Sequence, residues 1–237
     1  KELVCGMTST WGQEAKTTLE LKKLDVALGE QDPGGPNEAL MAWSGQTSGP
    51  VVAWADQAPI NRWIDILFLA ERLAPRPSLL PADATARAMV IGLSNEICGE
   101  LGIGWNRRLQ MFAPALALDS PPEGMARMGA KYRFNQSDLD VAGIRTANSL
   151  KALSAQLRTQ YARGKKFFVG DHVTALDVYW VAFANFLDPL PVGMCPMPES
   201  WRPSFVAQDP VVVAALDPLL LEHRAHIFHA HLRDPMQ

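Results

Sequence analysis

The stretch 48–60 constrains the fold of this chain most, because it joins a Gly-Pro step to two short apolar runs. The runs, Val51–Trp54 and Ala58–Ile60, flank a polar pair, a pattern typical of a β-hairpin. Pro50 lacks an amide donor and has a restricted φ, which suits the start of a strand or a sheet edge. The amphipathic residues that follow end at Pro75, as a helix would. This part of the chain therefore predicts a hairpin followed by a helix.

The residues before this stretch predict a strand, a helix and a second strand. We expect the strands at 2–5 and 25–28, a helix over 12–23 between them, and a short helix over 37–43. With the hairpin and the next helix, the order becomes βαβ-α-ββ-α. Two antiparallel strands added to a βαβ unit give a small mixed sheet with helices on its faces. We therefore expect an α/β domain over residues 1–76.

The second part of the chain predicts helices only. A proline-rich connection (PRPSLLP) precedes it, so we expect an all-helical domain over 82–237. Residues 82–112 form one long helix or two, with glycines as possible kinks. Three prolines make 113–133 mostly loop, and a long helix over 135–163 is expected to be capped by Ser137.

Charge, hydropathy and cysteine content exclude several classes of partner. The formal net charge is −3 and no basic stripe is present, so neither nucleic acid nor an anionic membrane is an expected partner. No apolar run reaches the roughly 18 residues that span a bilayer, and no signal peptide is visible. Three scattered cysteines without a CxxC motif indicate a reducing, cytoplasmic location. Four histidines near the C-terminus lack acidic partners at metal-ligand spacing, so no metal is expected.

Four short motifs carry a resemblance to a known family. Residues 9–25 resemble the first loop and helix of the cytosolic glutathione transferases, and 49–52 resemble their Val-Pro-Val-Leu motif, in which the proline is cis. Residues 61–71 resemble the helix that follows, and 170–177 are close to the family's GDxxTxAD motif, a capping box. The motifs occur in the family's order over nearly the whole chain. The resemblance implies a thioredoxin-like glutathione-binding domain followed by a helical domain that contributes the electrophile site.

Activation of the glutathione thiol is the chemistry that this resemblance implies. A thiol with a pKa near 8.5 is mostly protonated at pH 7. A hydroxyl donor and a helix N-terminus both stabilise the thiolate. By resemblance Ser9 matches the thiolate-stabilising serine and Thr10 is the reserve candidate, although either residue would also serve as a plain helix cap. No tyrosine occurs in the first half of the chain, so a tyrosine-type mechanism is not expected.

Further glutathione contacts follow from the same resemblance. The Gly49 backbone is expected to pair with the cysteinyl part of glutathione. Asn61 and Arg62 stand where the family has an acid and a serine that hold the γ-glutamyl end. Arg62 either pairs with the γ-glutamyl carboxylate or is a solvated surface arginine, and Trp11 either lines the site or packs beside it. The residues expected at the glutathione site are Trp11, Ser48, Gly49, Pro50, Asn61 and Arg62.

The implied function is transfer of glutathione to a small electrophile, apolar or aromatic, in detoxification and as a homodimer. Trp105, Arg108 and Met111 are expected in the electrophile pocket, where an arginine suits an acidic substrate unless it lies on a solvated face. The alternatives are a glutathione-dependent isomerase, dehalogenase or β-etherase. A non-catalytic, transferase-like protein-interaction module is a further alternative, favoured by the departure from the family at Asn61 and Arg62.

Overall fold

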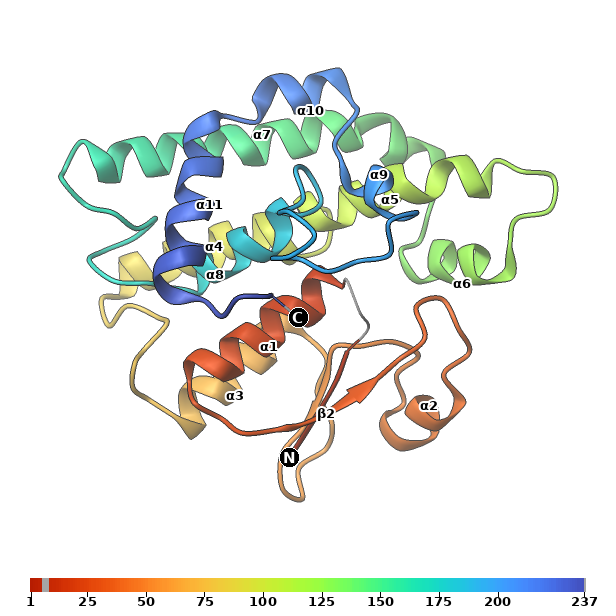
Figure 1. Cartoon of the computed structure of the whole chain (residues 1–237), viewed down its shortest axis with the longest axis horizontal. Helices are drawn as coiled ribbons and strands as arrows, with labels where there is room; N and C mark the ends of the chain where they lie inside the picture. Colours follow the sequence, from red (N-terminus) through yellow and green to blue (C-terminus); the bar gives the residue numbers. More distant parts are fainter. Residues whose placement is uncertain (6–8, 237) are drawn as a thin grey trace.

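The computed structural model describes residues 1–5 and 9–236, and it shows an α/β half followed by a helical half (Figure 1). The α/β half contains β1 (Glu2–Cys5), α1 (Thr10–Leu21), β2 (Ala27–Glu30), α2 (Glu38–Ser44), β3 (Val51–Ala53) and α3 (Trp63–Leu73). The helical half contains α4 (Ala84–Cys98), α5 (Ile103–Leu116), α6 (Glu123–Lys131), α7 (Gln136–Tyr161), α8 (Ala175–Ala184), α9 (Arg202–Phe205), α10 (Pro210–Ala215) and α11 (Pro218–His231). The fold class predicted from the sequence is confirmed.

The sheet has three strands in the order β2-β1-β3. Strand β1 is parallel to β2 and antiparallel to β3, so that Leu3 lies opposite Val52 of β3. The prediction that 58–60 forms the second strand of the hairpin is wrong, because Ile60 forms only an isolated bridge to Val52. Pro59 stands beside Ile60 and has no amide proton, so the ladder cannot extend through it.

Helices α1 and α3 lie side by side against the sheet, and α2 lies apart from them (Figure 1). Apolar residues at helical spacing on α1 and α3 pack against β1 and β3. The buried members of this small core are Leu3, Ala15, Leu19, Val52, Ile66, Leu69 and Ala70. Because β3 is antiparallel to β1, the start of β3, where the glutathione contacts are expected, lies beside the C-terminal end of β1.

The core of the helical half surrounds α8, all of whose residues are buried. A helix that is apolar on every side belongs in a protein interior. The predicted capping box at its start is confirmed. The Asp177 carboxylate accepts hydrogen bonds from the Thr174 amide at 2.8 Å and the Phe168 amide at 3.1 Å, and it also lies 2.8 Å from His223 Nε2. This buried carboxylate therefore joins three segments of the helical half.

Three expectations for the helical half needed the structure to settle or correct them. The 82–112 stretch forms two helices, since the chain turns at Gly99–Gly102, where a Gly102 Cβ would lie 2.7 Å from the Asn95 carbonyl oxygen. The loop expected over 113–133 is wrong for most of its length, because α6 and the last turn of α5 together occupy more than half of it. Pro122 stands at the N-cap of α6, where proline starts a helix rather than breaking it.

The cap expected at Ser137 is also wrong. Asn135 caps α7, because its side chain accepts a hydrogen bond from the Asp138 amide at 2.9 Å. Ser137 lies inside the first turn and donates to Asn135 Oδ1 at 2.6 Å. Both side chains are good caps, so the choice depends on the residue at which the backbone becomes helical.

The connection between the halves is held by a buried lysine. Lys22 Nζ lies 2.6 Å from Glu71 Oε1 and donates to the carbonyl oxygens of Ala74 at 2.8 Å and Pro77 at 2.6 Å. A buried charge with this many partners is a stable arrangement. Within residues 1–5 and 9–236, no helix has both the length and the apolar character to cross a membrane.

Candidate active site

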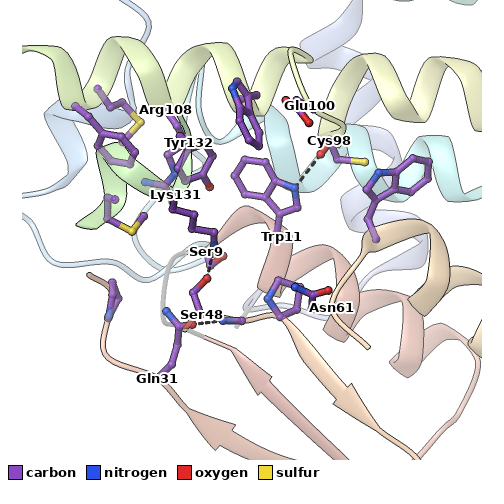
Figure 2. A pocket seen from close by; sticks show the side chains of 18 of the residues that line it. Ser9, Trp11, Gln31, Ser48, Asn61, Cys98, Glu100, Arg108, Lys131 and Tyr132 are labelled. Atoms are coloured by element: carbon purple, nitrogen blue, oxygen red, sulfur yellow. Dashed lines mark hydrogen bonds between the residues drawn. The ribbon is translucent and has the colours of Figure 1, made fainter. Parts of the chain in front are cut away.

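A cleft of about 540 Å³ opens between the two halves (Figure 2). Loops of the α/β half form one side, here called the loop wall: Ser9, Gln31, Ser48, Gly49, Pro50, Asn61 and Arg62. Helices of the other half form the opposite side, here called the helical wall, whose main members are Trp105, Arg108, Met111, Phe112, Lys131 and Tyr132. Trp11 stands between the two walls. The cleft therefore collects every predicted site residue except Thr10.

Ser9 is the N-cap of α1 and lies half-buried on the loop wall. Its Oγ accepts a hydrogen bond from the Gly12 amide at 3.3 Å. A hydroxyl that accepts in this way keeps its own proton for donation, so capping does not prevent a second role. The first turn of α1 carries no acidic residue, and the positive end of the helix dipole is therefore not neutralised there.

Thr10 does not reach the cleft. It is fully buried, on the same helical face as Glu14 one turn later. Within the described residues, neither Thr10 Oγ1 nor the Glu14 carboxyl oxygens have a hydrogen-bond partner. Burial raises the pKa of Glu14 well above its ordinary value, because it disfavours the charged carboxylate.

The Gly49-Pro50 peptide bond is cis, as the resemblance implies. The Gly49 amide donates to Gln31 Oε1, a contact that the sequence did not suggest. A Cβ at position 49 would lie 2.4 Å from the Val4 carbonyl oxygen, so only glycine fits without a shift of the backbone. The edge at Gly49 thus presents backbone to the cleft with Ser48 beside it.

Asn61 and Arg62 both line the loop wall. Asn61 Nδ2 donates to Gln46 Oε1 at 2.6 Å. The Arg62 side chain is 73% exposed, and its Nε is 3.9 Å from Asp65 Oδ2, too far for a hydrogen bond. The Arg62 guanidinium is therefore accessible to an anion in the cleft.

Trp11 fulfils both roles that the sequence left open. It lines the cleft, and its Nε1 donates to the Cys98 carbonyl oxygen at 2.9 Å (Figure 2). Its ring meets Phe183 edge-on with centroids 4.8 Å apart. Because Cys98 and Phe183 belong to the helical half, this side chain of α1 fastens the two halves together beside the cleft.

The helical wall is aromatic, and part of it was missed from the sequence. Tyr132 packs against Trp105 and Phe112, with ring centroids 4.8 and 5.6 Å apart. Lys131 and Tyr132 were missed because their segment was expected to be loop. The spacing of Met125, Met128 and Tyr132, three and then four residues apart, is the helical signal that would have revealed α6.

Arg108 brings a half-buried cation to the helical wall. Its guanidinium carbon lies 4.5 Å from the centroid of the Phe186 ring, and the Phe112 and Phe205 rings are 5.7 and 5.9 Å away. Burial lowers the pKa of Arg108, an effect that the neighbouring Tyr132 opposes, and an arginine remains charged under such a shift. The preceding residue, Arg107, instead points into the core and donates to the Phe186 carbonyl oxygen at 2.8 Å.

Lys131 adds a second cation on the same wall and reaches across the cleft. Its Nζ donates to the Ser48 hydroxyl, and in Figure 2 the side chain runs down toward Ser48 and Ser9. Desolvation inside the concave cleft, followed by repulsion from Arg108, lowers the pKa of Lys131 to about 8. Lys131 is therefore mostly charged at pH 7 and mostly neutral at pH 9.

Metal-binding clusters were sought across the described chain. Between residues 1–5 and 9–236, no group of three or more His, Cys, Asp or Glu side chains is placed to hold a metal ion.

Comparison with known proteins identifies the fold. No protein-family model matches the sequence, and no curated protein matches it either. A glutathione S-transferase from Methylobacterium radiotolerans in complex with glutathione sulfonate is 15% identical over 97% of this chain and 91% of its own, with a TM-score of 0.66. The tau class glutathione S-transferase of mango, Mangifera indica, is 21% identical over 94% and 97%, with a TM-score of 0.57.

A third similar structure, maleylpyruvate isomerase from Pseudomonas aeruginosa, is 19% identical over 98% of this chain and 93% of its own, with a TM-score of 0.58. At these identities the likeness establishes the fold. The chain has the fold of the glutathione S-transferases, and the resemblance read from its four sequence motifs is confirmed at that level.

Proposed function

We propose that this protein is a glutathione-dependent transferase that activates the glutathione thiol at Ser9 for attack on a small electrophile, apolar or aromatic. One observation carries the proposal: the Ser9 hydroxyl and the Gly49 backbone edge open into the same cleft. The glutathione S-transferases of the same fold, one of them solved with glutathione sulfonate, support it.

The chemistry follows from the position of Ser9. Glutathione docks with its cysteinyl backbone along Gly49, and its thiol then lies near the N-terminus of α1. A hydrogen bond from the Ser9 hydroxyl and the positive end of the helix dipole both favour the thiolate, which lowers the thiol pKa. The thiolate attacks an electrophilic carbon held against the helical wall, and the leaving group departs with the bonding electrons.

Glutathione-dependent isomerisation is the second candidate. The cations Arg108 and Lys131 suit an acidic, unsaturated substrate, and maleylpyruvate isomerase is among the proteins of similar fold. In such a reaction the thiolate adds to a double bond and leaves again after rotation, so glutathione is not consumed. Dehalogenation and aryl-ether cleavage use the same thiolate with other leaving groups, and they stay within this proposal.

Calorimetric titration with glutathione, combined with turnover of 1-chloro-2,4-dinitrobenzene, tests the proposal. We expect binding at millimolar glutathione. Ser9→Ala removes both the hydroxyl and the cap, whereas Ser9→Gly removes the hydroxyl and keeps most of the capping energy. Both variants should lose about tenfold or more in turnover at pH 7, the worth of a hydrogen bond to a charged group. Only Ser9→Ala should also lose about 1 kcal/mol of unfolding free energy.

Two results would count against this proposal. If the wild type gives neither heat with glutathione nor turnover, the enzyme reading fails and the non-catalytic interaction module becomes the better account. If Ser9→Gly keeps full turnover, glutathione chemistry survives but Ser9 acts only as a cap. Loss of activity that tracks loss of stability in both variants would lead to the same conclusion.

Homodimerisation, a cytoplasmic location and a detoxifying role are part of the proposal. Phe68 on α3 is 39% exposed beside a shallow pocket, which suits an interface with a second copy. All three cysteines are unpaired thiols, as expected in a reducing compartment. Light scattering should give twice the 26.0 kDa chain mass, and Phe68→Glu should return the mass to one chain. A single-chain mass for the wild type would exclude the dimer.

A further inference from the structure

Resting on the proposed function, we propose that the electrophile is an acid: a flat aromatic or conjugated molecule whose carboxylate binds Arg108. The proposal depends on how Arg108 is partnered, on which other charges line the cleft, and on the shape and chemistry of the helical wall.

Arg108 has unused hydrogen-bonding capacity. Among the residues that the structure describes, its guanidinium forms no ion pair, and its Nε is buried without a hydrogen-bond partner. Three phenylalanine rings surround the guanidinium instead, the nearest being Phe186 at 4.5 Å. Cation–π contacts and the neighbouring Tyr132 hydroxyl replace part of the lost hydration, but the Nε–H donor is left without an acceptor. A half-buried guanidinium with a buried, unpaired Nε–H is costly to the free protein, and a ligand carboxylate would satisfy it.

The neighbouring arginine shows that the chain satisfies such a group elsewhere in the same region. Arg107 donates to the Phe186 carbonyl oxygen at 2.8 Å and to Gln110 Oε1 at 2.8 Å. Arg224 on α11 pairs with Asp188 at 3.0 Å, although its Nε, like that of Arg108, has no hydrogen-bond partner among the described residues. Arg108 differs from both in that it lines the cleft. The contrast indicates that its partner comes from the ligand.

The charges around the cleft also favour an anion. Three cationic side chains line it, namely Arg62, Arg108 and Lys131, against a single acid in the described part of the chain, Glu100. Glu100 Oε1 already lies 3.2 Å from Arg133. The cleft is therefore locally positive in a protein whose net charge is −3.

Glutathione also carries carboxylates, so the cations must be assigned between two ligands. Arg62 belongs to the loop wall, and Lys131 contacts Ser48 beside the Gly49 edge. Arg108 lies on α5 in the helical wall, among aromatic rings. It is the cation placed for the second substrate, and Lys131 lies between the two.

The wall around Arg108 indicates the rest of the substrate. Trp105, Phe112 and Tyr132 offer aromatic surfaces, and Met111, Met125 and Met128 offer adaptable thioether side chains. Flat conjugated molecules pack well on such surfaces. A planar guanidinium at one end fixes the position of a carboxylate by a pair of parallel hydrogen bonds.

A matched pair of substrates tests the inference: 4-chloro-3,5-dinitrobenzoate and the neutral 4-chloro-3,5-dinitrobenzamide. In both, the thiolate attacks the ring carbon that bears chlorine, a C–S bond forms, the C–Cl bond breaks, chloride leaves, and the thiol proton goes to solvent. Each kcat/KM is divided by the uncatalysed rate constant with glutathione, which removes the difference in intrinsic reactivity. We expect a corrected preference for the acid of about tenfold to a hundredfold, the worth of hydrogen bonds to a charged group.

Three variants assign the preference to Arg108. Arg108→Met should abolish the preference, whereas Arg108→Lys should keep part of it because the charge remains. Arg163→Met removes the same charge from an exposed position outside the cleft, and the preference should not change. Circular dichroism checks that each variant is folded. If Arg108→Met does not fold, the wild-type preference together with the Arg108→Lys result decides.

Binding without chemistry separates this inference from the proposed function. The unreactive 3,5-dinitrobenzoate and 3,5-dinitrobenzamide are titrated calorimetrically into the wild type and the variants without glutathione. Tighter binding of the acid that is lost in Arg108→Met, with no turnover of any electrophile, would support the acid site and defeat the transferase proposal. Turnover of both chlorides with equal corrected kcat/KM, and equal binding of the two analogues, would overturn the acid site and leave the transferase standing.

Discussion

The two walls of the cleft differ in the chemical groups that they present to a ligand. The loop wall presents backbone and small polar groups just before β3 and α1 begin, with Gly49, Pro50 and Ser9 as its main members. The helical wall presents large side chains from α5 and α6, among them Trp105, Arg108 and Tyr132. A backbone edge can recognise any peptide of the right shape, whereas a side-chain wall selects by charge and aromatic surface.

The two walls therefore suit two different tasks, binding of glutathione and selection of the second substrate. Glutathione is a peptide, and it is proposed to dock against backbone that depends on local geometry more than on side chains. The second substrate is proposed to meet side chains such as Arg108 and Lys131, which are easily exchanged without changing the fold. Four experiments test this difference between the two walls.

Gly49→Ala should affect the loop wall most. The new Cβ would lie 2.4 Å from the Val4 carbonyl oxygen, so β1 and the edge must move apart. We expect a loss of about 1–3 kcal/mol in the free energy of unfolding, typical of overpacking, and a loss of at least about tenfold in glutathione affinity. Urea denaturation and calorimetry measure the two effects.

Gly92→Ala is the matched control for this change, since nothing lies within 4 Å of a Cβ at that position in α4. It should gain up to about 1 kcal/mol from the higher helix propensity of alanine. If Gly49→Ala kept wild-type stability and glutathione affinity, the close approach of Gly49 to the Val4 carbonyl oxygen would not matter for function.

Trp11→Phe tests the contact that holds the walls together. Phenylalanine keeps most of the ring packing on Phe183 but cannot donate to the Cys98 carbonyl oxygen. We expect the free energy of unfolding to fall by about 0.5–1.5 kcal/mol, the usual worth of one hydrogen bond. Trp43→Phe on α2, where the tryptophan is 41% exposed, should change stability by less than about 0.5 kcal/mol. Equal losses in the two variants would contradict the bridging role.

Lys131 predicts a pH dependence of substrate choice. Its pKa of about 8 means that the ammonium is charged below that pH and loses its charge as the pH rises to 9. The corrected preference for 4-chloro-3,5-dinitrobenzoate over 4-chloro-3,5-dinitrobenzamide should therefore fall by up to about fivefold between pH 7 and pH 9, the worth of an accessible ion pair. Ionisation of the glutathione thiol affects both substrates equally, so it cancels in the ratio.

The other charges near Lys131 do not imitate this profile. Arg108 stays charged, burial raises the pKa of Tyr132 and keeps that phenol neutral, and Glu100 is paired with Arg133. Lys131→Gln should therefore show a lower preference that is flat from pH 7 to pH 9. A preference in this variant that still declines with pH would show that another group is responsible.

Arg62→Met should have the smallest effect on the protein itself. The side chain is 73% exposed and has no close ion pair, so the free energy of unfolding should stay within about 0.5 kcal/mol of wild type. If Arg62 pairs with the γ-glutamyl carboxylate, glutathione affinity should fall by up to about fivefold, because a solvent-accessible cation would be lost. Unchanged affinity in calorimetry would leave Arg62 as a solvated surface arginine.

Local patterns in the sequence were sufficient for the framework of the fold. Alternating and helical periodicities predicted β1, α1 and α3, and the Gly-Pro step located the edge at Gly49. These features depend on neighbours within a few residues, which a linear sequence displays. Two predictions failed over proline. Pro59 was given too little weight in the second hairpin strand, and the prolines of 113–133 were given too much, since Pro122 stands at the start of a helix.

The sequence by itself determined the fold class, the Gly49-Pro50 edge and the position of Ser9 at the start of a helix. Only the tertiary structure decided which residues share the cleft. Arg107 and Arg108 are adjacent in the chain, yet one helical step turns a side chain by roughly 100°, so the first is buried against the Phe186 carbonyl and the second lines the helical wall. Lys131 reaches Ser48 across 83 residues of chain. Contacts of this kind depend on how the two halves pack together, and no short-range sequence pattern encodes them.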